Sequence, residues 1–442
     1  MAGEREPRAM RWLWFLFISI APLACVRAEA PVRLALEDAL AAVERVNVNV
    51  LLSREGFQQA LEVANAQRAD LLPSVGASVQ QRRAESPIIT RTSKAAGTPT
   101  NRSDARLTAS LALLSPQQIA QYRAAQVGVE VAQLDVQQTI QTILATAAQT
   151  FFTHLRNVKR IDVLDANVRR GHELLTLARN QVAAGVATQI DITRAESQLA
   201  LAEQARLQQA TVVYDSELRL KRLLDLDVAL TLELADFIVR RSEEAPFQGG
   251  TERTLFERRS DYLRARRQLD QTAEALRAVR WERFGALSLT GDYGLANSEV
   301  FARHDEIAWS AGVALSVPVF DGQRIRSGER QARSQLRSQE FRVRQLELQI
   351  AAEVRLAHQD ARSRHAQVGV AEKSLALSME ELQLAQRRFE QGVADNREIV
   401  DAQNRLALAS DNLNEAIYQY NLSRVELART RGDVRVVLSE RE

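Results

Sequence analysis

The sequence predicts a mainly α-helical protein with a small β part, in which a unit of helix, two strands and very long helical hairpin occurs twice. Three observations support this prediction. Residues 185–203 and 392–410 match without a gap, each half has one very long stretch of helical periodicity, and each half has two short stretches of alternating apolar and polar residues. The first observation indicates a tandem duplication. The matching pairs are Gly185/Gly392, Val186/Val393, Ala187/Ala394, Ala195/Ala402, Leu199/Leu406, Ala200/Ala407, Leu201/Leu408 and Ala202/Ala409.

Composition and charge narrow the possible functions. The 442 residues include 58 Lys and Arg against 56 Asp and Glu, and the net charge of +2 argues against a nucleic-acid-binding surface. Aromatic residues make up only 5%, a low fraction for a compact globular core. The single cysteine, Cys25, excludes an intrachain disulfide framework and a thiolate zinc site.

The N-terminus predicts a secretory signal peptide over residues 1–28. Arginines precede an apolar run from Trp12 to Ala24, and a small-residue cleavage site ends at Ala28. A membrane anchor is the weaker interpretation, because a spanning helix needs about 20 apolar residues. Acylation of Cys25 stays an open, less favoured alternative, since Pro22 stands where a lipoprotein carries an aliphatic residue. No later segment is typical of a transmembrane helix, so membrane insertion would have to use strands.

The first half begins with helical periodicity from Val32 to Asp70, which Pro73 ends. Apolar and polar residues then alternate in two segments, and we expect barrel strands at 74–81 and 106–114. The residues between these strands, 82–104, are rich in Ser, Thr, Pro and Gly, so an exposed loop is expected there.

A very long helix is expected from Pro116 to Gly185, with an interruption near Gly171 left open. Its length is about 100 Å at 1.5 Å per residue, too long for a single globular domain, so it must project. Glycine at 185 suits the left-handed conformation that ends helices, and residues 188–224 return as a second helix.

The second half repeats this order after a linking segment, residues 225–250. A helix is expected over 252–283, and another very long helix over 323–391. Strands are expected at 286–293 and 309–320. The predicted division is therefore signal peptide 1–28, first repeat 29–245, second repeat 246–434 and tail 435–442.

The last predicted strand has the clearest alternation, which predicts two chemically different faces. Four short strands cannot close a membrane barrel, because eight is the usual minimum. Strand number and helix length together predict a barrel shared between subunits, with a helical tube attached. Trp309, Val313, Leu315 and Val317 are expected to face lipid, and Ser310, Gly312 and Ser316 to face the lumen.

Five segments carry a resemblance to a known family. They are Leu71–Ser74 (LLPS), Ser316–Gly322 (SVPVFDG), Arg388–Val393 (RFEQGV), Ile399–Gln403 (IVDAQ) and Arg179–Val186 (RNQVAAGV). With these segments placed in the duplicated order, the chain from about residue 31 to 433 resembles the TolC-like outer-membrane efflux-channel family.

The resemblance implies a homotrimer with a twelve-stranded β-barrel in outer-membrane lipid, continued by an α-helical barrel across the periplasm. Its implied partners are a periplasmic adaptor and an inner-membrane transporter driven by protons or ATP. Both an efflux duct and a type I protein secretion channel stay open, as does a non-channel periplasmic coiled-coil scaffold. The tyrosine that helps to lock the closed tip of the best-known member falls on Phe389, which cannot donate that hydrogen bond.

The sequence contains no constellation typical of an enzyme, metal site or cofactor site. The five histidines are scattered and are expected to be solvated at the surface, and no phosphate-binding glycine loop is present. The chain is therefore expected to depend on partners for energy.

The residues around the two turns are the candidate functional residues. Glu398 and Asp401 share one helical face, and threefold symmetry would multiply them into pore-lining carboxylate rings; Asp191 matches Glu398 in the first repeat. The alternative is structural, since acidic residues in a first turn complement the helix dipole. Phe389 completes the gate candidates. The candidates for adaptor docking are Gly185, Val186, Ala187, Gly392, Val393 and Ala394.

Overall fold

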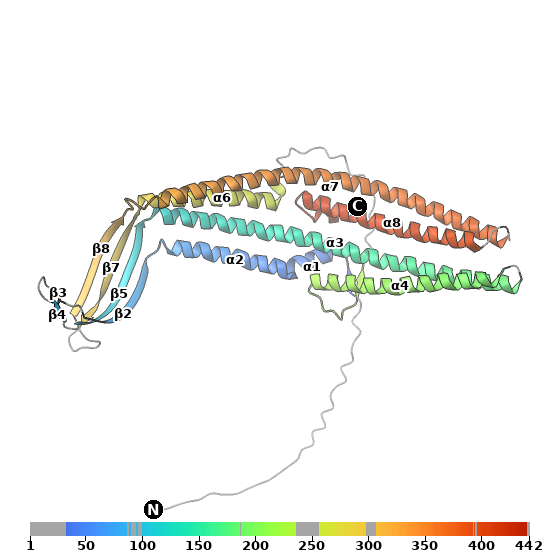
Figure 1. Cartoon of the computed structure of the whole chain (residues 1–442), viewed down its shortest axis with the longest axis horizontal. Coiled ribbons are helices and arrows are strands. Elements are labelled where there is room, and N and C mark those ends of the chain that lie inside the picture. The colour runs from blue at the N-terminus through green and yellow to red at the C-terminus, as the bar shows by residue number, and fades with distance from the viewer. Residues whose placement is uncertain are drawn as a thin grey trace, which may run out of the picture.

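The molecule is elongated, with a four-stranded sheet at one end and two helical turns at the other (Figure 1). The structure is a computed structural model. The structure describes residues 32–85, 88–89, 94–95, 100–185, 187–235, 256–297, 306–391, 393 and 396–439. The predicted signal peptide and Cys25 lie outside the described residues.

The helices account for most of the described chain, as the sequence predicted. None of them contains an apolar stretch that could carry it across a bilayer. They are α1 (Leu36–Val46), α2 (Val48–Ala69), α3 (Pro116–Ala183), α4 (Gln189–Leu223), α6 (Ser260–Trp281), the 3₁₀ helix η1 (Glu282–Phe284), α7 (Arg324–Glu390), α8 (Asn396–Thr430) and α9 (Val436–Ser439).

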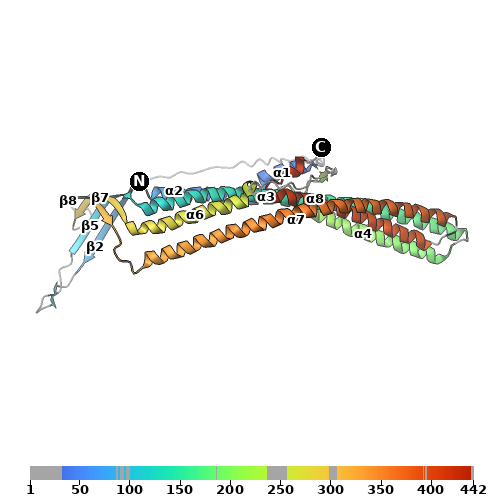
Figure 2. The same cartoon turned by 90° about the horizontal axis from the view of Figure 1, so that it is seen from above.

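Two helices, α3 and α7, run the length of the molecule from the sheet to the turns (Figures 1 and 2). Near the sheet, α2 packs on α3, and α6 packs between α3 and α7. Near the turns, α4 packs on α3, and α8 packs between α3 and α7. The helices therefore form a layer of four at each end of the molecule. The order is α2-α3-α6-α7 near the sheet and α4-α3-α8-α7 near the turns.

The long helix α3 has 68 residues and passes through Gly171 without a break, so the interruption left open there does not occur. A Cβ at Gly171 would lie 3.2 Å from the Leu199 side chain, which explains the glycine by the close approach of α4. The helix begins where Ser115 accepts a hydrogen bond from the Gln118 N–H, with Pro116 in the first turn.

The main sheet has the order β2-β5-β7-β8, with every neighbouring pair antiparallel. This order is the same as that of the helices α2, α3, α6 and α7, because each strand leads directly into or out of one of them. The strands of this sheet are β2 (Ser74–Ala84), β5 (Thr100–Leu114), β7 (Ala286–Asn297) and β8 (Glu306–Ser316), and a separate hairpin consists of β3 (Ile88–Ile89) and β4 (Lys94–Ala95).

The strand boundaries differ from those predicted. Residues 82–84 and 100–104 extend β2 and β5 into the segment expected to be a loop, and β7 continues to Asn297 rather than ending at 293. The strand predicted at 309–320 starts at Glu306 and ends at Ser316. It ends early because Pro318 has no N–H to donate, and Gly322 and Gln323 then adopt positive φ before α7.

The middle of the molecule holds the largest buried core and most of the other corrections. Residues 32–34, expected to be helical, form β1, which pairs in parallel with β6 (Leu232–Leu234) in the predicted linker. The first helix is broken at Asn47, and the predicted tail contains α9, whose Val437 is buried in this core. Phe151 and Phe152 of α3 lie at the centre of the core, in contact edge to face.

Two polar joints connect helices that lie end to end in this region. Asn47, at the N-terminus of α2, donates from Nδ2 to the carbonyl oxygen of Leu223 at the end of α4 (3.1 Å). Arg259, at the N-terminus of α6, donates from Nη1 to the carbonyl oxygen of Thr430 at the end of α8 (3.3 Å). The duplicated halves thus use the same joint with different side chains.

Candidate functional site

The four-stranded sheet has one face that is apolar in every strand. Each row of this face runs in register across the strands. Examples are the row Ala77, Leu107, Tyr293 and Trp309, and the row Leu111, Leu289 and Val313. The alternation along single strands therefore combines into one continuous apolar surface.

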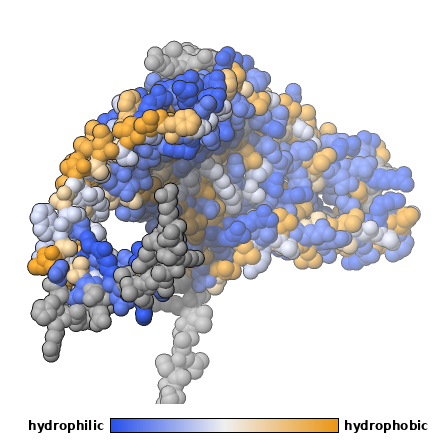
Figure 3. Space-filling model, turned by 60° about the vertical axis from the view of Figure 1, so that its left-hand side comes forward, coloured by the Kyte–Doolittle hydropathy of each residue, from blue (hydrophilic) through white to orange (hydrophobic). Residues whose placement is uncertain are grey.

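No part of the chain that the structure describes covers this apolar face, which appears as the hydrophobic band along the strands in Figure 3. Trp309 is 72% exposed, and Leu315 on the same strand is 68% exposed. Ser310, Gly312 and Ser316 lie on the opposite face, as the alternation predicted. Val317 lies beyond the end of β8, so its predicted place on the strand face was wrong.

The opposite face carries a charged network that sequence reasoning missed. Arg106 of β5 forms ion pairs with Asp292 of β7 and with Asp104 (3.3 Å). Ser310 of β8 donates to Asp292, so the network links three strands. The signal was present in the sequence, because Arg106 and Asp104 occupy the polar positions of the alternation, but Asp104 had been assigned to a loop.

The two outer strands, β2 and β8, each have one hydrogen-bonded neighbour in the described chain. A sheet edge with unpaired N–H and C=O groups is a template for pairing with another strand. Among the described residues, the sheet is therefore open, with an unpaired edge at β2 and another at β8.

At the opposite end of the molecule, the first turn is built around Gly185. Its φ of +76° is favourable for glycine, and its N–H donates to the Val182 carbonyl oxygen (3.0 Å). Ala187 is half-buried next to it. The candidate Val186 lies outside the described residues.

Asp191 stabilises the start of the helix after this turn. Its Oδ2 accepts from the Thr188 backbone N–H (3.0 Å) and from the Thr188 hydroxyl (2.7 Å), and Arg194 lies 3.4 Å from its other oxygen. These hydrogen bonds from Thr188 lower the pKa of Asp191 below its ordinary value of 3.8. The geometry therefore favours the structural interpretation of Asp191.

Because the pKa of Asp191 is lowered in the folded protein, its stabilising effect is present above pH 3.8 and is lost as the pH falls through the lowered value. We expect Asp191→Ala to destabilise this turn by about 0.5–2 kcal/mol at neutral pH, as for other lost capping interactions. Hydrogen exchange of the amides near the turn would measure the effect. Exchange rates equal to those of the wild type at neutral pH would contradict it.

The second turn keeps Val393 exposed at 68%, with its N–H donating to the Arg388 carbonyl oxygen (2.9 Å). Gly392 and Ala394, its neighbours among the docking candidates, lie outside the described residues. Glu398, one helical turn beyond, forms an ion pair with Arg388 across the turn (2.8 Å). Glu398 thus joins the two helices of this hairpin.

Phe389 is buried within the single chain. Only 7% of it is exposed, and it belongs to an apolar cluster that joins the two hairpins near the turns. This position explains why an apolar aromatic residue is tolerated where the resemblance places a tyrosine. The other buried members are Leu174, Leu175, Ala178, Ala195, Leu199, Leu382, Ala385, Ile399, Ala402 and Leu406.

Asp401 differs from the other acidic candidates. It is exposed, and no hydrogen bond or ion pair joins its side chain to another residue of the described chain. In the ungapped alignment of the two repeats it corresponds to Arg194, so the first repeat carries the opposite charge there. Among the acidic candidates, Asp401 is therefore the one whose side chain forms no structural contact of this kind within the described residues.

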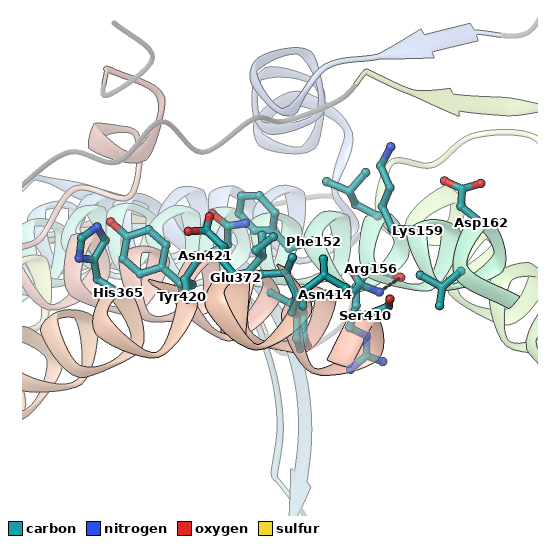
Figure 4. A pocket seen from close by; sticks show the side chains of 17 residues that line it. Phe152, Arg156, Lys159, Asp162, His365, Glu372, Ser410, Asn414, Tyr420 and Asn421 are labelled. Atoms are coloured by element: carbon teal, nitrogen blue, oxygen red, sulfur yellow. Dashed lines mark hydrogen bonds between the residues drawn. The ribbon is translucent and has the colours of Figure 1, made fainter. Parts of the chain in front are cut away.

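A groove of about 600 Å³ lies farther from the turns, between α3, α7 and α8 (Figure 4). Its residues mainly bind one another. Arg156 forms an ion pair with Glu415 (3.1 Å) and lies 4.5 Å from the Tyr418 ring, and Asn414 donates to the Arg156 carbonyl oxygen (3.1 Å). The groove contains none of the candidates derived from the sequence.

The expectation that every histidine is solvated at the surface was wrong for His154. It is only 3% exposed and lies 2.8 Å from the Ser216 hydroxyl, and burial lowers the pKa of its imidazole. His304 lies outside the described residues. The described residues hold no group of three or more acidic, histidine or cysteine side chains that could bind a metal ion.

Comparison with known protein families identifies the family to which this chain belongs. A family model described as "Outer membrane efflux protein" matches residues 35–225 and 253–433. The chain belongs to this family. The predicted resemblance is therefore confirmed, and this outer membrane efflux protein can be compared with individual relatives.

Outer membrane protein OprJ of Pseudomonas aeruginosa is 28% identical over 305 residues, 66% of this chain and 61% of OprJ. The solvent efflux pump outer membrane protein SrpC of Pseudomonas putida is 25% identical over 316 residues, 67% of this chain and 64% of SrpC. The matched segments span less than two thirds of the length of these relatives.

Solved structures confirm the predicted fold class. The outer-membrane channel OprN superposes with a TM-score of 0.79 at 20% identity, covering 90% of this chain and 89% of OprN. The CmeC outer membrane channel of Campylobacter jejuni gives a TM-score of 0.80 at 18% identity, covering 90% and 85%. This outer membrane efflux protein thus shares its arrangement of sheet and long helices with channel proteins.

The position of Asp401 leads to a prediction for this outer membrane efflux protein. If three copies place Asp401 around a narrow neck, Asp401→Asn should lower cation selectivity, because carboxylate rings favour cations in a pore. Reversal potentials in a salt gradient across planar bilayers would measure this. Asp191→Asn is the matched control, since Asp191 is engaged by Thr188 and should leave selectivity unchanged. An Asp401→Asn channel with the wild-type reversal potential would exclude the ring.

Proposed function

We propose that this chain is the outer-membrane exit duct of a tripartite efflux pump, which passes small molecules from the periplasm to the cell exterior. The observation that carries the proposal is the sheet with one apolar face in all four strands, continued directly by helices that span the molecule. A hydrocarbon environment would remove this apolar face from contact with water. The helical layer would then extend through the periplasm.

In this proposal three copies pair edge to edge through β8 and β2 and close a twelve-stranded barrel. Four strands are too few for one chain to close a barrel alone, and the two open edges make the chain self-complementary. The apolar rows face lipid, and the network of Arg106, Asp104 and Asp292 faces the water-filled lumen. Residues 29–245 and 246–434 contribute two equivalent halves of each subunit.

The proposed partners are a periplasmic adaptor and an inner-membrane transporter driven by protons or ATP. The duct itself carries out no catalytic step and binds no nucleic acid. Transport of small organic molecules is favoured over type I protein secretion because relatives such as SrpC are described as components of solvent efflux pumps.

The helix tips are the proposed docking surface for the adaptor, through residues 185–187 and 392–394. Val393→Asp should abolish efflux while leaving trimer yield unchanged, because the exposed valine makes few contacts within its own chain. Val393→Leu, which keeps an apolar tip, should retain efflux. Drug-susceptibility assays with both variants at equal expression would measure this, and full resistance with Val393→Asp would contradict docking through this residue.

The proposed function is tested by location, assembly and conductance together. The protein should be recovered in the outer-membrane fraction as a trimer that dissociates on heating, and it should form channels in planar bilayers. It should also restore drug resistance to a strain that lacks its own exit duct but has a matching adaptor and pump. Recovery as a soluble periplasmic helical protein without conductance would instead favour the scaffold alternative.

A further inference from the structure

A basic and aromatic patch lies where the sheet meets the helices. Trp281 ends α6, and Phe284 ends η1, two residues before β7 begins at Ala286. Their rings lie 5.1 Å apart, and they are 42% and 58% exposed. Two large aromatic side chains left exposed next to each other indicate a surface that contacts something other than water.

Arginines surround the aromatic pair in greater number than the carboxylates that could neutralise them. Arg280, Arg283 and Arg333 all bind the single carboxylate of Glu329, at 3.0, 2.8 and 3.0 Å. Arg277, the fourth arginine of the patch, forms an ion pair with Glu274. Four guanidinium groups therefore face two carboxylates, and the patch keeps an excess of positive charge.

The same residues line a hollow in the surface. It has a volume of about 570 Å³ and lies between the end of α6 and the second and third turns of α7. Arg280 and Arg283 are each about half exposed, as is Arg333, so their remaining N–H groups can reach a ligand. Guanidinium groups bind phosphate in bidentate geometry.

The position of the patch relative to the membrane identifies the ligand, given the proposed insertion of the sheet. A transmembrane strand of about 9–11 residues crosses the hydrocarbon core, and β7 has 12 residues. Residues just before β7 would then lie at the level of the lipid headgroups, where Trp is enriched and basic residues meet anionic lipids.

We propose that Arg277, Arg280, Arg283 and Arg333, with Trp281 and Phe284, form a binding site for the phosphate headgroup of an anionic glycerophospholipid in the periplasmic leaflet. The aromatic rings lie at the boundary of the acyl chains, and the arginines engage the phosphate. In this proposal the site opens to the same side as the apolar rows of the sheet. It anchors the base of the barrel at a fixed depth, which the apolar face alone does not define.

The variant Arg283→Gln/Arg333→Gln tests the site, because it keeps the Arg280–Glu329 ion pair and so leaves the half-buried Glu329 carboxylate paired. The matched control is Arg344→Gln/Arg362→Gln, which removes two exposed arginines from α7 farther from the sheet. Native mass spectrometry of the purified trimer would be used to titrate phosphatidylglycerol and phosphatidylcholine with identical acyl chains.

We expect the test variant to bind phosphatidylglycerol about thirty-fold more weakly than wild type, since each arginine near an anionic lipid contributes roughly five-fold. The control should bind it as wild type does, and phosphatidylcholine should bind weakly and equally to all three. Equal affinity for phosphatidylglycerol in wild type and test variant would overturn the inference. Displacement of the lipid by inorganic phosphate alone would also overturn it, by assigning the site to the free anion.

Conductance of the same preparations separates this inference from the proposed function. A conducting trimer without preference for anionic lipid contradicts only the lipid site. A test variant with altered conductance and unchanged lipid binding would place the arginines in the tunnel and would likewise contradict it. A wild-type protein that forms neither trimers nor channels contradicts the proposed function itself.

Discussion

Arginine in place of Val313 is expected to destabilise the membrane-inserted protein by about 2 kcal/mol, whereas arginine in place of Gly312 is expected to have little effect. Val313 lies on the apolar face opposite Leu289, away from both ends of β8, and it is 61% exposed in the single chain. In a bilayer a guanidinium at this position would have to leave water, and no partner on the apolar face could neutralise it. Gly312 lies on the polar face, where a guanidinium stays hydrated.

The two variants introduce the same side chain at adjacent positions, so each is a control for the other. Folding into phospholipid vesicles could be titrated with urea and followed by fluorescence of Trp309, which lies on the apolar face. Val313→Ala is a further control, because it removes apolar area without adding charge. Equal destabilisation by Val313→Arg and Gly312→Arg would contradict the assignment of the two faces.

The parts of this fold that sequence could predict are those with a strong and repeated pattern. The helices α3 and α7 begin and end within two residues of the predicted positions, because long periodicity bounded by proline and glycine is a local signal. The two faces of β8 were also predictable, because the period of two along a strand fixes which side chains share a face. The duplication added evidence by giving each signal twice.

The parts that sequence missed depend on contacts between distant residues. The parallel pair β1 and β6 is only three residues long, and it joins segments about 200 positions apart in the chain. The break at Asn47 was missed because apolar residues continue on both sides of it. Asn47 caps α2 by accepting from the Asn49 N–H (3.0 Å), and it donates to the Leu223 carbonyl oxygen across the joint, a contact between residues far apart in the chain.

The candidate site was only partly predictable for the same reason. Asp191 and Glu398 occupy equivalent positions, yet one caps its own helix and the other binds Arg388 across the turn. The arginine patch at the base of the sheet was not predicted. Its members are 56 positions apart at most, but only the packing of α6 against α7 brings Arg280, Arg283 and Arg333 to one carboxylate.

Replacement of Arg259 by methionine is expected to cost about 3–5 kcal/mol, the largest single effect we predict in the helical part. Only 4% of Arg259 is exposed, and it binds Asp261 (3.0 and 2.7 Å) and Glu353 (3.1 Å). It also holds the Thr430 carbonyl oxygen at the end of α8. Methionine has similar length but leaves both carboxylates without their shared partner, at a position where water has limited access.

The stability lost in Arg259→Met should become smaller as the pH falls. Burial alone would raise the pKa of Asp261, but the hydrogen bonds and charge of Arg259 outweigh burial and hold it below 3.8. In wild type the stabilising effect is therefore present above pH 3.8 and is lost as the pH falls through the lowered pKa. In the Arg259→Met variant, burial is the dominant effect on Asp261 and raises its pKa. As the pH falls, Asp261 is therefore protonated at a higher pH in the variant than in wild type, and protonation removes its uncompensated charge. The difference in stability between the two proteins should shrink as the pH is lowered from 7.

Denaturant unfolding of the detergent-solubilised protein at several pH values would measure this difference, with two variants as controls. Arg259→Met/Asp261→Asn/Glu353→Gln removes the uncompensated charges and should recover much of the loss, because paired removal of buried charges is far less costly than removal of one partner. Asn47→Leu breaks the equivalent joint in the first repeat, which contains no charge. It should cost less, about 1–3 kcal/mol for the unpaired Leu223 carbonyl together with the lost cap of α2, and should show no dependence on pH. If Arg259→Met were as mild and as insensitive to pH as Asn47→Leu, the ion pairs of the second joint would contribute no more than its hydrogen bond to Thr430.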